Sequence, residues 1–155
     1  MLERLVPPAL EPVTLAIYEY ARRMTPVQFL DAGVVLNAVR RKLGRYFARY
    51  DAWLSPTTTR AAEPWGNYNL GRNDVSMDDV AEKILRPVCQ FTLPHNIMGT
   101  PAMSLPLAMH STGVPVGVQI AARPAAEHLL LQLAAALEQA MPWKDRVPTL
   151  HVSKM

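Results

Sequence analysis

Apolar residues recur every three or four positions in two stretches near the start of the chain, a spacing that predicts amphipathic helices. The first stretch covers residues 10–24. The second begins at Thr25, where Thr25, Pro26 and Gln28 form the pattern of a capping box with proline at the first helical position. One face of this second helix carries Leu36, Val39, Leu43, Phe47 and Tyr50.

Two further helices are predicted later in the chain. One starts near Ser76, has two aspartates in its first turn, and should end or kink at Pro87. The other covers residues 125–141 and stops at Pro142. Its apolar positions include Leu130, Leu133, Ala134 and Leu137.

Strand patterns are fewer. Residues 52–55 form a short apolar run that stops at Pro56, and residues 103–107 and 114–120 alternate between apolar side chains and others. Residues 110–113 contain turn formers and join the last two runs, which predicts a β-hairpin.

Residues 56–75 are polar and rich in turn-forming side chains, and they predict one long loop. A loop of that length is usually functional or lies against another element. The resulting order is helix, helix, strand, loop, helix, strand, strand, helix. At 155 residues, the sequence therefore predicts a single α/β segment with few strands.

The composition indicates a surface that is short of charge. Charged residues make up 19% of the chain, below the roughly 25% of a typical soluble domain, and hydrophobic residues make up 50%. Such a surface is expected where more protein covers it. The single cysteine, Cys89, allows no internal disulfide, and the first residues lack the apolar core of a secretory signal. Both features favour a cytoplasmic setting.

Three motifs in the chain share their spacing with one enzyme family. Residues 94–102, PHNIMGTPA, resemble the P-x-N-x-x-G-x-P-A segment of the amidase signature family. Residues 113–119, GVPVGVQ, resemble its G-x-P-x-G-x-Q hairpin, and residues 51–57, DAWLSPT, resemble its D-x-x-x-x-P-T strand and loop. The run CQFTLP at 89–94 is similar to amidases related to the aminohexanoate cyclic-dimer hydrolase. The resemblance extends in order over residues 10–143.

The motif residues also have physical roles in the backbone. Gly99 and Gly117 suit positions where the chain turns or where another element comes close. Pro101 fixes φ before a strand, and the amide of Asn96 can hold a loop backbone. Because these roles maintain the fold, the motifs support a fold more firmly than an activity.

The resemblance implies that residues 1–155 are a C-terminal part of an enzyme that hydrolyses carboxylic amide bonds. The implied fold is a partial amidase signature fold, in which a few strands of a mixed sheet, including one β-hairpin, pack with about four helices. Family members use two serines and a lysine from a Gly/Ser-rich N-terminal half. This chain has seven glycines and no Gly-Gly or Ser-Ser pair. We therefore expect no catalytic residue here, no cofactor, and no activity of the chain alone.

The resemblance also nominates Cys89, Phe91 and Asn96 as residues that line a substrate pocket. Cys89 is explained equally well as a buried small hydrophobic residue. Core packing for Phe91 and loop bracing for Asn96 are competing explanations. In the long loop, Trp65 and Tyr68 could cover a cleft or lie in a solvent-facing turn.

Other functions have weaker support in the sequence. Basic residues at 41, 45 and 49 share a helix face that could bind phosphates, but a solvated face explains them more simply and no nucleic-acid motif is present. The four histidines lack metal-ligand spacing, although His95 lies inside the family motif. No apolar run approaches the roughly 18–20 residues of a membrane span. We expect no nucleic acid, metal or membrane as partner.

Association with more protein is the remaining expectation. Strands taken from a larger sheet leave unpaired edges, which favour pairing with another chain. The expected partner is an N-terminal amidase half or a second copy of this chain. A non-catalytic interaction module with the amidase fold is the alternative function.

Overall fold

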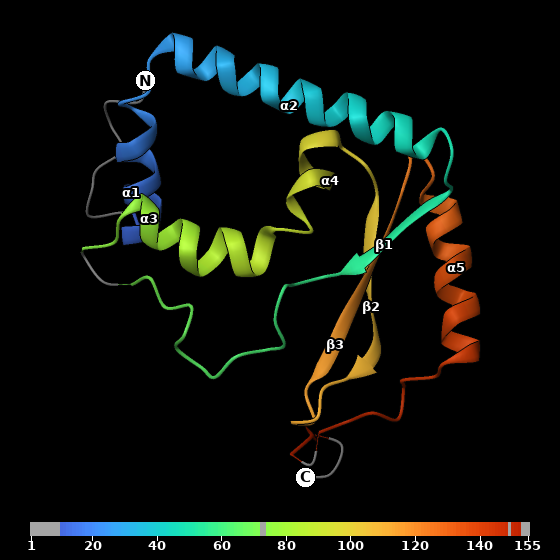
Figure 1. Ribbon diagram of the computed structural model, residues 1–155. Helices are drawn as coiled ribbons and strands as arrows, with labels where there is room; N and C mark the ends of the chain where they lie inside the picture. The colour runs from blue at the N-terminus through green and yellow to red at the C-terminus, as the bar shows by residue number, and fades with distance from the viewer. Residues whose placement is uncertain (1–9, 72–73, 149, 153–155) are drawn as a thin grey trace.

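The computed structural model describes residues 10–71, 74–148 and 150–152. Within them the elements occur in the order α1 (Pro12–Ala21), α2 (Pro26–Phe47), β1 (Ala52–Pro56), α3 (Met77–Val80), the π-helix η3 (Ala81–Cys89), α4 (Leu93–Met98), β2 (Ala102–Met109), β3 (Pro115–Ala122) and α5 (Glu127–Ala140). Figure 1 shows a small sheet with α5 along one side, while α2 extends away from the sheet toward α1 and α3. The α/β class and the few strands expected from the sequence are confirmed.

The three described strands form an antiparallel sheet in the order β1-β3-β2. The predicted hairpin is present between β2 and β3. Its turn is closed by a hydrogen bond of 2.9 Å from the His110 amide to the Val114 carbonyl, and Gly113 takes a φ of 84°. That left-handed conformation is readily available only to glycine, so the turn explains this residue.

One face of the sheet packs against α5 and forms the core. Ile120 and Ala122 point to the same side of β3, because side chains alternate along a strand. They form a buried cluster with Ala126 and Leu130 at the start of α5. The partly buried side chains around this cluster are Ala52, Met103, Leu105, Leu129, Leu133 and Leu137. The apolar positions predicted for the last helix therefore face the sheet.

The opposite face of the sheet is polar. In the strand register, Gln119 of β3 lies between Ser55 of β1 and Ser104 of β2. Two residues along, Thr57 follows β1, and its hydroxyl lies 2.5 Å from that of Ser104. A Cβ added to Gly117 would lie 2.7 Å from both hydroxyl oxygens. Glycine is therefore required at this position by the close approach that the sequence predicted.

The helix that begins at Ser76 does not end at Pro87. Its predicted start is confirmed by a capping box between Ser76 and Asp79. After Val80 the helix widens to the π form and continues to Cys89. Proline in an α-helix clashes with the carbonyl four residues earlier, and the wider π turn relieves this crowding.

The short helix α4 was not predicted. The sequence placed Asn96 in a loop, but the structure places it inside α4 with an exposed side chain. The helix ends at Gly99, which takes a φ of 68° and donates its amide to the His95 carbonyl at 2.8 Å. Arg40 of α2 donates its Nε to the Ile97 carbonyl at 2.8 Å, which holds the end of α4 against α2.

His95 is the buried side chain of α4, with 4% of its surface exposed. Its ring packs edge-to-face on Trp53 of β1, with the centroids 5.5 Å apart. Its Nδ1 lies 3.0 Å from the Thr100 hydroxyl, whereas the buried Nε2 has no hydrogen-bond partner among the described residues. Burial lowers the pKa of His95 below its ordinary value of 6.5.

The close approach at Gly117 leads to a prediction about stability. Gly117→Ala should lower the free energy of unfolding by about 1–3 kcal/mol, because the new methyl group forces the two hydroxyls apart. Gly44→Ala, in α2, is the matched control, because a Cβ there meets nothing within 4 Å. It should raise the free energy by about 0.4–1 kcal/mol. Urea unfolding followed by circular dichroism distinguishes the two, and equal effects would contradict the geometry.

The lowered pKa of His95 predicts a pH dependence of folding. The unfolded chain takes up the proton at a higher pH than the folded chain does, so this contribution is fully present above pH 6.5. It decreases as the pH falls through 6.5 toward the lower folded pKa. Thermal unfolding between pH 7.5 and 5 should show a larger fall in Tm for the wild type than for His95→Phe. If the Tm of the two proteins changes with pH in parallel, protonation of His95 is not coupled to folding.

Candidate functional site

The side chain of Gln119 joins the polar sheet face to the segment that follows η3. Gln119 is 4% exposed, and its Nε2 donates to the Ser55 hydroxyl at 3.1 Å and to the Phe91 carbonyl at 2.9 Å. Three parts of the chain, β1, β3 and the turn at residue 91, therefore meet at one amide group. A buried amide that satisfies its donors in this way fixes the relative position of the segments it joins.

Of the three predicted pocket residues, Phe91 lies in this turn and Cys89 lies directly before it. Cys89 is the last residue of η3, and its half-buried thiol forms no disulfide. Its carbonyl accepts hydrogen bonds from the amide and the hydroxyl of Thr92, at 3.2 and 3.3 Å. Phe91 is half-buried and connects to Gln119 through its carbonyl. Asn96 lies apart from them, on the exposed side of α4.

The long loop is attached to η3 at a single carbonyl group. Thr59 donates both its amide and its hydroxyl to the Pro87 carbonyl, at 3.1 and 2.9 Å. Pro87 has no amide hydrogen to donate, but its carbonyl accepts both of these hydrogen bonds. This attachment places the loop beside the polar face of the sheet.

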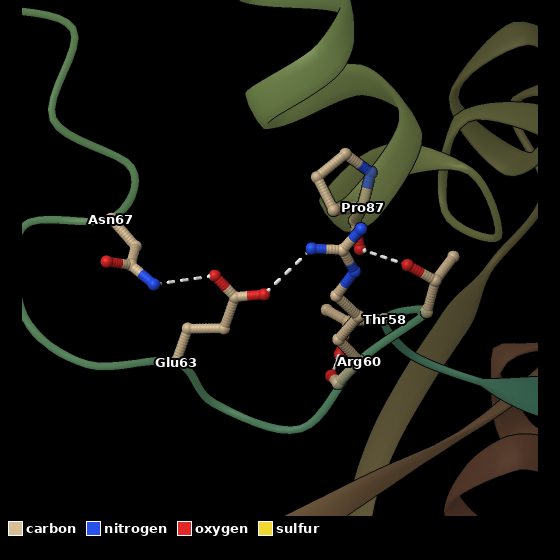
Figure 2. Close-up of polar contacts among 6 residues, drawn as sticks. Thr58, Arg60, Glu63, Asn67 and Pro87 are labelled. Atoms are coloured by element: carbon tan, nitrogen blue, oxygen red, sulfur yellow. Dashed lines mark hydrogen bonds and ion pairs between the residues drawn. The ribbon is translucent and has the colours of Figure 1, made fainter.

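A second set of contacts shapes the loop itself, as Figure 2 shows. Arg60 donates from Nη1 to one carboxylate oxygen of Glu63 at 3.0 Å, and Asn67 donates to the other oxygen at 2.9 Å. The hydrogen bond from Asn67, followed by that from Arg60, lowers the pKa of Glu63 below its ordinary value. Arg60 and Asn67 therefore favour the ionised form of Glu63 and close the loop on itself.

A cavity of about 360 Å³ lies between the loop and the polar face. Its lining combines hydroxyl groups, one guanidinium and apolar side chains, among them Thr57, Arg60, Tyr68, Val88, Ser104 and Gly117. Tyr68 therefore lies at this cavity, whereas Trp65 is fully exposed and does not line it. Ser104 lies outside the sequence motifs. Gly117 indicates its position, because the missing side chain of this glycine leaves room for the hydroxyl pair.

Within the described residues, the serine hydroxyls of the polar face have hydrogen-bond partners that are not bases. Ser55 contacts the amide of Gln119, and Ser104 contacts the hydroxyl of Thr57. A nucleophilic serine needs a neighbouring base, and neither partner takes up a proton near neutral pH. Hydroxyls and amides in this arrangement are suited to hold or orient an amide group.

Neither a metal-binding cluster nor a membrane-spanning helix is found among the described residues. No cluster of three or more histidine, cysteine or acidic side chains within them could hold a metal ion. No helix in the described part of the chain is long and apolar enough to cross a membrane. Arg41 and Arg45 are exposed on α2, whereas Arg49 is exposed in the turn that follows the helix.

Comparison with curated proteins identifies relatives that share this segment. The chain is 41% identical over 106 residues to the 6-aminohexanoate-cyclic-dimer hydrolase of Paenarthrobacter ureafaciens, which covers 66% of this chain and 21% of the relative. It is 43% identical over 106 residues to the hydrolase of the same name from Pseudomonas sp. (strain NK87), again covering 66% of this chain and 21% of the relative. The chain thus spans about a fifth of the length of these relatives.

Solved structures contain the same fold. A 6-aminohexanoate cyclic dimer hydrolase superposes with a TM-score of 0.81 at 33% identity, over 94% of this chain and 31% of the other. A bacterial aryl acylamidase of the amidase signature family superposes with a TM-score of 0.65 at 23% identity, over 83% of this chain and 26% of the other, which supports the fold alone. The family model described as Amidase matches residues 4–131. The Asn-Gly-Pro segment, the hairpin and their polar face are thus elements of a family fold, and the chain belongs to the amidase family.

Proposed function

We propose that this chain is a non-catalytic part of an amide hydrolase that supplies scaffold and one wall of the substrate pocket. The observation that carries the proposal is the chemistry of the polar face. Its serines are paired with an amide and a hydroxyl, and neither partner is a base. The two serines and the lysine that the family resemblance implies would come from a separate portion of the enzyme.

The relatives support hydrolysis of an amide bond as the reaction of the assembled enzyme. Two curated 6-aminohexanoate-cyclic-dimer hydrolases are 41% and 43% identical to this chain, and a solved hydrolase of that name matches with a TM-score of 0.81. A linear or cyclic carboxylic amide is therefore the substrate class that we assign. The single cysteine and the absence of a disulfide from Cys89 favour a cytoplasmic enzyme.

Within this enzyme we assign Cys89 and Phe91 to the pocket wall. Both are half-buried, Phe91 in the turn that Gln119 holds against the sheet and Cys89 directly before it, and Val88, one residue before Cys89, lines the 360 Å³ cavity. Asn96 is exposed on α4. Its assignment therefore requires that the remaining portion of the enzyme bring substrate to that side of α4.

An interaction module without any role in hydrolysis is the competing function. This function is compatible with the same fold but predicts no activity under any condition. Adding a portion of the enzyme that contains the catalytic serines distinguishes the two functions. Hydrolysis that depends on both pieces supports the enzyme, and binding without hydrolysis supports the module.

The proposal predicts that the pure 155-residue chain does not react with a fluorophosphonate probe, because neither serine of the polar face has a base as partner, and Ser76 is committed to a helix cap with Asp79. Gel fluorescence after incubation with the probe measures this, with an intact amidase of the family as the positive control. Stoichiometric labelling of the chain that heat denaturation abolishes would overturn the non-catalytic assignment.

A further inference from the structure

The first half of α2, residues 26–36, has a surface unlike the rest of the described helices. Its sequence, PVQFLDAGVVL, contains only two polar side chains, Gln28 and Asp31. Five of its apolar side chains are more than 60% exposed: Val27, Phe29, Leu30, Val34 and Val35. The second half of the same helix behaves differently, since Leu43 and Phe47 are each only 8% exposed. We call residues 26–36 the apolar half of α2.

The exposed apolar side chains lie on two opposite sides of the helix. With 3.6 residues per turn, Val27, Leu30 and Val34 fall on one side, whereas Phe29 points the other way. Leu36, seven positions after Phe29, returns to the same side as Phe29. A helix that is apolar all round is normally buried among other elements rather than lying on a surface. The apolar half of α2 therefore lacks cover on both sides.

A second copy of this chain is a poor fit for that requirement. Two copies related by a twofold axis contact each other through the same patch, so one contact covers one side of the helix. The opposite side would stay exposed. The protein that covers the apolar half of α2 must therefore be large enough to contact both sides of the helix.

The solved relatives contain such a body. The cyclic dimer hydrolase that superposes on 94% of this chain is much longer, and the match covers only 31% of it. We propose that the apolar half of α2 inserts between elements of the remaining portion of an amidase and is the principal contact between the two. This inference rests on the proposed function, because it takes the catalytic portion of the enzyme as the occupant.

The positions of the basic residues on α2 indicate where the proposed contact ends. Arg40, Arg41 and Lys42 follow the apolar half, and Arg40 is already bonded to the Ile97 carbonyl of α4 within this chain. Charged residues are depleted from the cores of interfaces and enriched outside them. The covered surface therefore stops between Leu36 and Arg40, and the basic residues beyond it face solvent.

The test uses the Paenarthrobacter ureafaciens hydrolase without its matched segment as the binding probe. Calorimetry measures its affinity for the full 155-residue chain, and sedimentation gives the size of each species. Phe29→Gln and Val34→Gln alter opposite sides of the helix, while glutamine keeps a high helix propensity. Arg45→Gln is the control, because Arg45 is exposed on the same helix beyond the proposed contact. Circular dichroism confirms that each variant remains folded.

We expect the wild type and Arg45→Gln to bind the probe equally well, and each of the other two variants to bind about 30-fold more weakly or worse. If only one of these two variants binds the probe more weakly, the helix does not insert between two surfaces and the proposal is wrong. Equal binding by all four proteins would overturn the docking site but leave the proposed function intact. If the wild type does not bind, or forms a dimer that the substitutions dissociate, the assigned occupant is wrong.

Discussion

The buried amide of Gln119 is the contact on which the arrangement of this chain depends. It takes the central position of the three-stranded sheet and donates to Ser55 and to the Phe91 carbonyl. The first bond lies within the sheet, and the second reaches the turn between η3 and α4. Leaving a buried amide and carbonyl unpaired costs about 1–3 kcal/mol per group, so the turn is strongly held against the sheet. Because the loop is attached to η3 at Pro87, its position depends on the same contact.

The two faces of the sheet consequently have separate roles. The face toward α5 is apolar and forms a buried hydrophobic cluster that stabilises the fold. The other face carries hydroxyls and amides, together with a cavity whose shape depends on Gly117. In the proposed function, this division lets the segment serve as a wall of the pocket, while residues from the remaining portion of the enzyme carry out the chemistry.

Local sequence signals predicted the elements whose geometry is decided locally. The capping boxes at Thr25 and Ser76 and the hairpin turn at Gly113 all follow from short-range chemistry. Elements decided by tertiary packing were missed. Pro87 predicted that the helix ends or kinks there, but the helix continues in the π form to Cys89, and the Pro87 carbonyl is bonded to Thr59 of the loop. The helix α4 has six residues, too few for a periodic pattern, and depends on Arg40 and on the burial of its histidine. The Ser104 hydroxyl pair depends on strand register, which a single motif does not encode.

Amide hydrogen exchange in Gln119→Leu tests most directly whether this side chain holds the segment of η3 and α4 against the sheet. If it does, amides of η3 and α4 should exchange much faster than in the wild type, while those of the β2–β3 hairpin and α5 keep most of their protection. Gln132→Leu, on the exposed side of α5, is the matched control and should leave both regions unchanged. Wild-type protection of η3 and α4 in Gln119→Leu would contradict the central role of Gln119.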